Sequence, residues 1–569
     1  MPDPIRKIAL SRYAAQALAA HPALAEEADP ARAAQAPFSA AEMALALHES
    51  DSDDEAAFKR RLRRLRQRVL IRTMARDLEA GDMHSRDGLA EVCATMSELA
   101  EQMVRSALRW LREEELIVVA MGKLGGGELN VSSDIDLVFV HPDTRDKPAK
   151  QKQIERTGRK LIALLGEVTE DGFAFRVDMR LRPYGDSGAL VSSFGALETY
   201  FVAQGREWER YAWIKARPIS GTPSGVAGSK HAELAEIVRP FVYRKYLDYG
   251  TLEAMRRLHA EVRRDMARRE LAEHVKLGPG GIREIEFIAQ ALQLVRGGRD
   301  PELTARPTLA VLELLSRKRH LPEKAAQDLA AAYVFLRNVE HRLQYLDDAQ
   351  THDLPPGEED RARLAQMAGY ASWDAFVGVL NAHREAVTRH FQSVFAERGA
   401  EGEAKPWPEH PRLAALRSSQ RYAQLPEDSK RRFDALIPAL AHAAAATADP
   451  EASLARGVDL LEAIARRAAY LALLAERPEA LERVTRMIGA SSWAAQYVTQ
   501  HPLLLDELLD DRVLYSPPDW REFELGLRGA LAAAAGDVER QMNAVREQHQ
   551  SQLFRLLAQD LAGLLTVEV

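Results

Sequence analysis

Cysteine is almost absent from this sequence of 569 residues, in which Cys93 is the only one. A single cysteine excludes an internal disulfide, and we expect a cytoplasmic protein because structural disulfides belong to oxidising compartments. The N-terminus, MPDPIRKIALSRYAAQALAAHP, lacks the long apolar core of a signal peptide. Because no uncharged apolar run of about 18 residues occurs, we also expect no transmembrane helix and no membrane partner.

An excess of basic residues is also lacking. The 77 Lys and Arg residues stand against 84 Asp and Glu, which gives a formal net charge of -7. This balance argues against a general nucleic-acid binder, which is usually basic overall. The composition, 46% hydrophobic and 28% charged, is typical of a globular protein, and the length exceeds what one hydrophobic core normally serves.

Strand-like segments are few and lie close together. Elsewhere Ala, Leu, Arg and Glu dominate, and apolar residues recur every three or four positions, which predicts helices. We therefore predict a mostly α protein with one small α+β domain and helical bundles on both sides of it. The predicted strands are LIVVAM (116–121), DIDLVFV (134–140), FAFRVDMRL (173–181) and GALVSS (188–193), with a helix over 149–168.

Two segments have the composition of linkers, GTPSGVAG (221–228) and AEGEAKPWPEHP (400–411). With a further boundary near 112, they divide the sequence into four predicted parts. These are an N-terminal helical region (1–112), the α+β domain (113–221) and two further helical domains (222–404 and 405–569).

A run of basic residues, KRRLRRLRQRVLIR (59–72), carries an apolar stripe at helical spacing. One interpretation is a solvated helix whose charge is balanced by the acidic segment ESDSDDEAAF just before it. The other is a docking site for an acidic protein partner. The sequence leaves both open.

The stretch MGKLGGGELNVSSDIDLVFV (121–140) places glycines between two predicted strands. It is not a P-loop, because Lys123 is followed by Leu124 where that motif needs Ser or Thr. It is not a dinucleotide fingerprint either, because no long helix follows the glycines. Glycines let backbone N–H groups approach a phosphate closely. We therefore predict phosphate or nucleotide contacts from a loop that comprises Gly122, Lys123, Gly125, Gly126 and Ser133.

The acidic pair after the glycines predicts a metal site. Asp134 and Asp136 are two residues apart on a predicted strand, so their side chains share one face. Two carboxylates on one face suit Mg²⁺ or Mn²⁺, which completes its shell with phosphate oxygens and water. Asp178, on another predicted strand, would complete a three-carboxylate cluster that can hold two ions for displacement at phosphorus.

Arginines and a lysine near these strands predict further phosphate contacts. Arg180 shares the strand face of Asp178, Arg182 follows two residues later, and guanidinium groups suit phosphate oxygens. Lys215 and Arg217 share one face of a short strand or turn in EWERYAWIKARPI (207–219). For this second pair, a nucleotide contact and a simple surface pair both remain open.

The glycines followed by Asp-x-Asp resemble the nucleotidyltransferase superfamily with a polymerase-β-like palm. In this sequence Gly122-Lys123 stands where that superfamily has Gly-Gly or Gly-Ser. A narrower resemblance is to the glutamine synthetase adenylyltransferase/adenylyl-removing enzyme family. It rests on five blocks in order: GKLGGGELNVSSDIDLVFV, VDMRLRPYGDSGALV, WERYAWIKARPI, KLGPGGIREIEFIAQ (276–290) and FLRNVEHRLQYLDDAQTHDLP (335–355).

The family carries two catalytic halves, and KLGPGGIREIEF resembles the adenylyl-removing half. No second glycine–Asp-x-Asp set occurs after residue 400, so the sequence resembles that half with the connecting helical region of a longer protein. The resemblance makes 222–404 the helical domain that completes the catalytic half and 405–569 a helical regulatory or connecting domain. It also gives Arg283 and Glu284 a site-lining role. As plain sequence, the same residues are a glycine-rich loop that opens a helix.

The implied reaction is phosphorolysis of an adenylylated tyrosine on glutamine synthetase, in which phosphate takes up AMP to give ADP. The resemblance also implies control by the uridylylated PII signal protein and by glutamine, and a role in nitrogen metabolism. Two alternatives remain: forward adenylyl transfer from ATP, and a regulatory binding module whose palm is idle.

Overall fold

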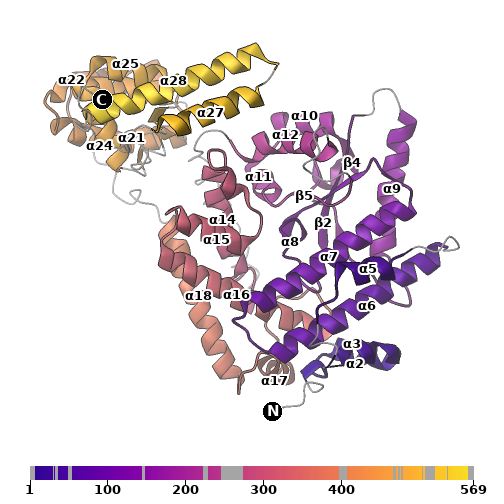
Figure 1. Ribbon diagram of the computed structural model, residues 1–569. Helices are drawn as coiled ribbons and strands as arrows, with labels where there is room; N and C mark the ends of the chain where they lie inside the picture. Colours follow the sequence, from indigo (N-terminus) through magenta and orange to yellow (C-terminus); the bar gives the residue numbers. More distant parts are fainter. Residues whose placement is uncertain are drawn as a thin grey trace. The chain divides into compact units, whose positions relative to one another are not determined.

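The computed structural model of this protein is mostly helical, with one small mixed sheet, as predicted (Figure 1). Its residues form two compact units that divide between Phe395 and Ala396. The predicted boundary at 112 lies inside the first unit. The predicted boundaries at 222 and 405 lie outside the described residues. The structure describes residues 7–29, 31, 36–48, 54–143, 148–221, 229–244, 273–395, 406–465, 470–471, 474–475, 478–502, 504–505, 519–534 and 536–561.

The sheet has five strands among the described residues. Strand β1 pairs antiparallel with β2 on one side and with β5 on the other, while β3 and β4 both pair parallel with β2. The third strand is much shorter than the predicted 173–181, because the chain turns away at once, with Arg182 N–H bonding to Met179 C=O. The strands are β1 (Ile117–Ala120), β2 (Ile135–His141), β3 (Val177–Asp178), β4 (Val191–Ser193) and β5 (Arg217–Pro218).

One face of the sheet is covered by three helices, α6 (Glu55–Ala80), α7 (Arg86–Trp110) and α9 (Pro148–Gly166). The parallel pairing of β2 with β3 requires a crossover, and α9 supplies it, close to the predicted 149–168. The apolar side chains of β2 that precede and follow Asp136 point into this core, with Ile135 and Leu137 fully buried.

The remaining helices of the first unit pack on the sheet, on these three helices or on one another. The longest of them, α16 (Glu323–Asp347), packs against α14, α15 and α18 and extends from these helices toward the sheet (Figure 1). The others are α2 (Arg12–Ala20), α3 (Ala25–Ala28), α5 (Ala40–Ala46), α8 (Gly122–Gly125), α10 (Phe194–Ala203), α11 (Glu207–Trp213), α12 (Lys230–Val242), α14 (Ile282–Arg296), α15 (Thr308–Arg317), α17 (Glu358–Met367) and α18 (Trp373–Phe395).

The basic run 59–72 lies on α6 and is largely an internal feature. Arg63 is fully buried and donates hydrogen bonds to the backbone carbonyls of Leu164 and Gly172. Arg66, also buried, pairs with Asp348 at 2.6 Å. The interpretation as a solvated helix is wrong for these arginines, and so is a docking role, because their charges tie α6 to distant segments of the same unit.

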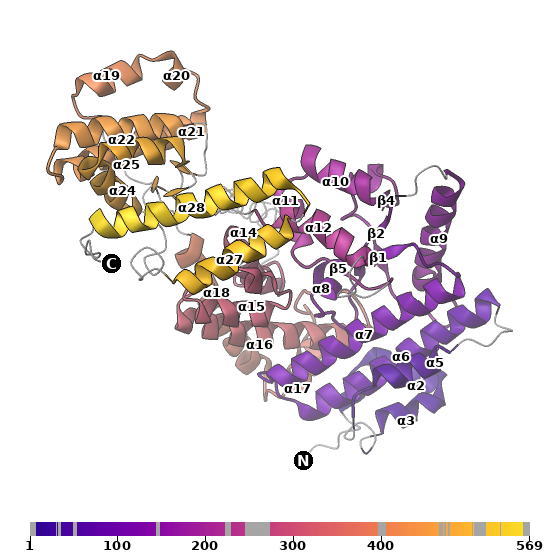
Figure 2. The same ribbon diagram turned by 45° about the horizontal axis from the view of Figure 1, so that its top comes forward.

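The second unit is a helical bundle (Figure 2). Its buried core is apolar and draws on α19, α20, α21, α22, α24, α25 and α28. No helix within the described part of the chain is long and apolar enough to cross a membrane. The helices are α19 (Pro411–Arg417), α20 (Gln420–Ala423), α21 (Glu427–Ala445), α22 (Pro450–Ile464), α24 (Pro478–Ala490), α25 (Ser492–Gln500), α27 (Trp520–Ala533) and α28 (Val538–Leu561).

Candidate active site

The three predicted carboxylates come together at one end of the sheet. Asp136 lies on β2 and Asp134 immediately before it. Asp178 lies on the parallel neighbour β3, and the strand register pairs Asp136 directly with Asp178. Side chains opposite one another on adjacent strands point to the same face, so these two carboxylates are neighbours.

The three carboxylates lie in different electrostatic surroundings. Burial, together with the charges of Asp178 and Asp134, raises the pKa of Asp136 to about 6, while Lys276 opposes the shift. Burial also acts to raise the pKa of Asp178, but hydrogen bonds and charge from Arg180 outweigh it and leave that pKa below its ordinary value. The site therefore holds one carboxylate whose charge is poorly compensated.

Two of the carboxylates have polar partners. Arg176 Nε donates to Asp134 Oδ1 at 2.6 Å, and Arg180 Nε donates to Asp178 Oδ2 at 2.8 Å. Gln350, which follows α16 in sequence, reaches Asp134 Oδ2 at 3.0 Å when its amide nitrogen faces the carboxylate. Arg180 keeps 75% of its side chain exposed, so its guanidinium faces solvent beside the cluster.

The glycine turn lies directly against the cluster. Gly122 has a left-handed backbone, with φ of 51°, and a Cβ atom at this position would lie 2.7 Å from Asp136 Oδ2. Gly125 packs so closely that a Cβ atom would lie 2.1 Å from the carbonyl oxygen of Lys215. These two positions therefore require glycine. At the first, the Asp136 carboxylate leaves no room for a Cβ atom, and at the second, the backbone just before β5 passes too close.

The predicted phosphate-binding cations mostly occupy internal ion pairs. Lys123 Nζ donates to Glu340 at 2.8 Å, and burial, then the charge of Arg337, lowers its pKa to about 8. Lys215 is buried, not a surface residue, and donates to Glu128 at 2.6 Å. In this arrangement neither amine is directed at an open phosphate site, and their contact with a nucleotide stays a prediction.

The other predicted residues lie around the same region of the unit. Arg217 bonds to Glu101 at 2.6 Å, and Arg182 pairs with Asp186 at 3.3 Å. Glu284 is buried at the start of α14 and accepts a hydrogen bond from Gly280 N–H at 3.1 Å, so it stabilises the glycine-rich loop before it. Arg283, Ser133 and Gly126 are partly or fully buried, and no substrate contact is assigned to them.

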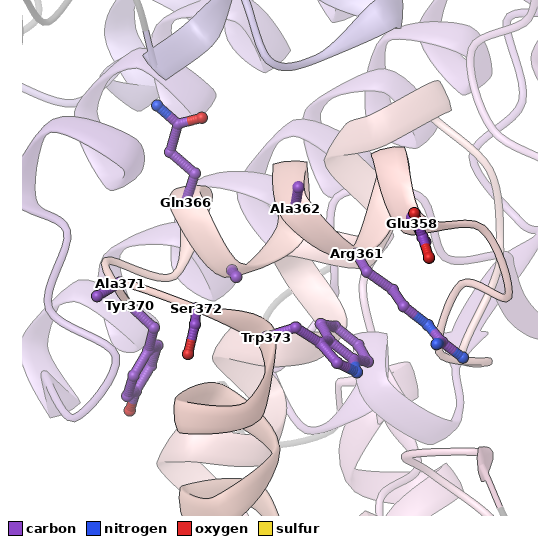
Figure 3. A pocket seen from close by; sticks show the side chains of 9 residues that line it. Glu358, Arg361, Ala362, Gln366, Tyr370, Ala371, Ser372 and Trp373 are labelled. Carbon is purple, nitrogen blue, oxygen red and sulfur yellow. The ribbon is translucent and has the colours of Figure 1, made fainter.

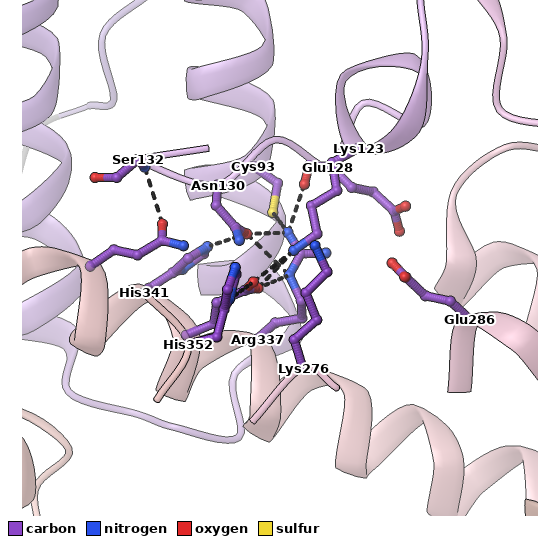
Figure 4. Close-up of polar contacts among 12 residues, drawn as sticks. Cys93, Lys123, Glu128, Asn130, Ser132, Lys276, Glu286, Arg337, His341 and His352 are labelled. Carbon is purple, nitrogen blue, oxygen red and sulfur yellow. Dashed lines mark hydrogen bonds and ion pairs between the residues drawn. The ribbon is translucent and has the colours of Figure 1, made fainter. Parts of the chain in front are cut away.

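A buried polar network connects the glycine turn with the segment after α16 (Figure 4). Its centre is Glu340, which is fully buried on α16 and binds Lys123 on one side. On the other side it contacts His352 Nδ1 at 2.8 Å, and Arg337 Nε approaches it at 3.2 Å. The Glu340 carboxylate thus holds in place both the glycine turn and the segment after α16, the two segments that flank Asp134 and Asp136.

Sequence reasoning missed Gln350, Lys276 and Glu340. Gln350 and Glu340 both lie in the block FLRNVEHRLQYLDDAQTHDLP, and Lys276 opens KLGPGGIREIEFIAQ. The cluster of polar residues at the end of the first block was the sequence feature that could have indicated a site there. The pairing of Glu340 with Lys123 bridges 217 positions and has no local sequence pattern.

The donor chemistry of the cluster fits a divalent cation. Hard carboxylate oxygens are the ligands that Mg²⁺ prefers. Burial, and then the negative charges of Asp178 and Asp134, raise the pKa of Asp136, and a cation would relieve that repulsion. As the side chains stand, no group of three His, Cys, Asp or Glu within the described ranges converges on one metal position. At this site Asp134 and Asp178 form ion pairs with Arg176 and Arg180.

A surface depression of about 580 Å³ lies at α17 and the turn into α18 (Figure 3). Arg361 on α17 lies over the ring of Trp373 there, 5.4 Å from its centroid. None of the three clustered aspartates lines this depression. It is therefore distinct from the candidate active site.

The sequence of this chain is similar to those of known proteins. The family model described as glutamate-ammonia ligase adenylyltransferase matches residues 5–231 and 481–569, and that of GlnD PII-uridylyltransferase matches 253–395. The relatives described below are each named bifunctional glutamine synthetase adenylyltransferase/adenylyl-removing enzyme.

The relative from Aromatoleum aromaticum is 49% identical over 560 residues, 90% of this chain and 58% of its own length. That from Chromobacterium violaceum is 48% identical over 578 residues, 94% of this chain and 63% of its own. That from Burkholderia pseudomallei is 44% identical over 630 residues, 99% of this chain and 67% of its own. The chain thus spans about three-fifths of the first two relatives. On these matches, the chain belongs to the glutamate-ammonia ligase adenylyltransferase family.

Proposed function

We propose that this chain removes AMP from an adenylylated tyrosine of glutamine synthetase by phosphorolysis and releases ADP. The observation that carries the proposal is the register of Asp136 with Asp178 on parallel strands, with Gly122 packed against Asp136. This is a carboxylate cluster suited to chemistry at phosphorus, in a chain whose relatives are named for adding and removing adenylyl groups on glutamine synthetase.

In the proposed reaction an oxygen of inorganic phosphate attacks the phosphorus of AMP, and the bond from phosphorus to the tyrosine oxygen breaks. The leaving phenolate has an ordinary pKa of about 10, so it departs more readily than an alkoxide and takes its proton afterwards. Two Mg²⁺ ions, bound by Asp134, Asp136 and Asp178, would neutralise charge on the phosphorus oxygens.

The chain's own residues contribute positioning and charge. Arg180 is exposed beside Asp178, so its guanidinium can bind an oxygen of the attacking phosphate. The absence of a side chain at Gly122 leaves room for Asp136 beside the turn. Gln350 and Arg176 hold the carboxylate of Asp134 in one orientation.

The proposed partners are adenylylated glutamine synthetase and the uridylylated PII protein, with glutamine as an opposing effector. The match of residues 253–395 to the PII-uridylyltransferase model supports a link with PII. We also propose that the helical second unit transmits these signals, which requires that an effector bind its two arrangements differently.

The test is to incubate the chain with adenylylated glutamine synthetase, phosphate and Mg²⁺ and to measure ADP. We expect ADP formation that depends on phosphate, and its loss in Asp136→Asn but not in Asp374→Asn, a change at an exposed carboxylate on α18. Incorporation of labelled AMP from ATP into unmodified glutamine synthetase would favour forward transfer instead. Turnover in neither direction would favour an idle palm that serves only in binding.

A further inference from the structure

One lysine beside the carboxylate cluster has an amine without a partner. Lys276 lies in the glycine-rich loop before α14 and is partly exposed. Its amine forms no hydrogen bond or ion pair with any residue that the structure describes. The amines of Lys123 and Lys215, by contrast, bind Glu340 and Glu128. Of these three lysines, Lys276 is therefore the one whose amine remains available to a ligand.

Backbone hydrogen bonds hold the loop of Lys276 beside the cluster. Val275 N–H donates to the carbonyl of His352 at 2.8 Å, so the loop runs alongside the segment that follows α16. Two residues before His352 in this segment, Gln350 reaches Asp134 Oδ2 at 3.0 Å. The backbone of the loop is thus fixed to the same segment that contacts the cluster.

The side chain of Lys276 extends from this loop toward Lys123 (Figure 4). After burial and the charge of Arg337, the charge of Lys276 also lowers the pKa of Lys123, which agrees with this proximity. Lys123 follows Gly122, where a Cβ atom would lie 2.7 Å from Asp136 Oδ2. The amine of Lys276 therefore lies near the carboxylate of Asp136, and it opposes the rise in the pKa of Asp136 that burial and Asp178 cause.

The carboxylate of Asp136 also lacks an ion pair within the described part of the chain. The other two carboxylates of the cluster are paired, Asp134 with Arg176 and Asp178 with Arg180. Asp136 and Lys276 are thus neighbouring opposite charges that do not pair with each other. Charges that are shielded from water are normally paired, so this arrangement indicates a ligand between them. A divalent cation on Asp136 would complete its shell with phosphate oxygens, and an amine suits the same oxygens.

We propose that Lys276 is a catalytic residue that binds the inorganic phosphate attacking the AMP phosphorus. The inference rests on the proposed phosphorolysis. Inorganic phosphate carries more than a single negative charge near neutral pH, whereas the phosphodiester of adenylylated tyrosine carries only one. An unpaired amine therefore favours inorganic phosphate, and together with the exposed Arg180 it supplies a second cation for this anion.

The amine of Lys276 keeps its proton throughout the reaction. It donates a hydrogen bond to one oxygen of inorganic phosphate while another oxygen attacks the phosphorus of AMP. The bond from phosphorus to the tyrosine oxygen breaks, and the phenolate leaves with the electron pair. The attacking phosphate becomes the β-phosphate of ADP and is still bound to Lys276, so the product reports the same contact.

The first test is calorimetric titration of the full chain with ADP and with AMP in the presence of Mg²⁺. We expect the wild type to bind ADP more tightly than AMP. Lys276→Met should weaken binding of ADP about tenfold, because a charge-assisted hydrogen bond is lost, and should leave binding of AMP unchanged. Lys276→Arg, which keeps the charge, should retain most of the preference for ADP. Lys152→Met, at an exposed lysine on α9, should change neither affinity.

The second test is the steady-state rate of ADP formation from adenylylated glutamine synthetase. Lys276→Met should raise the KM for phosphate about tenfold and leave the KM for adenylylated glutamine synthetase unchanged. Lys276→Gln provides a second neutral variant if Lys276→Met does not fold.

The outcomes separate this inference from the proposed function. Absence of ADP formation by the wild type would refute the phosphorolysis itself. ADP formation with an unchanged KM for phosphate and an intact preference for ADP in Lys276→Met would overturn the role of Lys276 alone. So would a rise confined to the KM for adenylylated glutamine synthetase, which would assign the amine to the phosphodiester. Tighter binding of Mg²⁺ by Lys276→Met, with the preference for ADP intact, would reduce Lys276 to a charge that offsets Asp136.

Discussion

Replacing Asp136 by Asn removes a carboxylate whose ionisation opposes folding. Its pKa in the folded protein is about 6, against an ordinary value of 3.8, because it is buried and faces Asp178 and Asp134. The asparagine has nearly the same shape, and the backbone bond from Met121 N–H to the Asp136 carbonyl, 2.9 Å long, is unaffected. The substitution therefore tests charge with little change in packing.

The size of the expected difference in unfolding free energy follows from the shift in the pKa of Asp136. A shift of about two units corresponds to roughly 2–3 kcal/mol of unfolding free energy at neutral pH. Because the folded-state pKa is the higher one, the unfolded chain releases the proton first. The stability of the wild type relative to the variant thus falls as the pH rises from about 4 to about 6, and is constant on either side of this window.

The assay is urea denaturation of both proteins across this pH range without metal. We expect Asp136→Asn to be more stable than the wild type at pH 7 and equal to it near pH 4. Asp186→Asn, at an exposed carboxylate, should show no such window. Added Mg²⁺ should stabilise the wild type more than Asp136→Asn, since a ligand that binds the folded state raises its stability. A pH-independent difference between the two proteins would refute the reasoning.

Three further outcomes are expected. Gly122→Ala should lower activity strongly and stability by about 1–2 kcal/mol, because its Cβ would meet Asp136 in a left-handed backbone, whereas Gly378→Ala, which meets nothing, serves as the activity control. Glu340→Gln should lower the unfolding free energy by about 3 kcal/mol, measured by urea denaturation, because Lys123 loses its buried partner. A chain that ends near residue 405 should keep basal ADP release and lose part of its response to uridylylated PII, and an inactive truncated chain would show that the second unit belongs to the catalytic unit.

Local patterns in the sequence were sufficient to locate the sheet and its carboxylates. The apolar runs of β1 and β2 are buried along their whole length, and such strands can be recognised without knowledge of their partners. The two-residue spacing of Asp134 and Asp136 and the buried Ile135 between them follow from strand alternation. Asp178 could be assigned to a neighbouring strand because a crossover helix precedes it.

Only the tertiary structure decided what the charged residues contact. Lys123 and Lys215 occur where a phosphate loop would place cations, yet their amines bind Glu340 and Glu128. Burial of a charge depends on which distant segment covers it, and no local period encodes that choice. Likewise, the end of α16 lies beside the start of β2, where the Ser132 hydroxyl donates a hydrogen bond to Asp348, 216 positions away in the sequence. This placement lets Gln350, just after α16, reach Asp134. The sequence thus determined which side chains can do chemistry, and the packing of helices on the sheet determined which of them are free to do it.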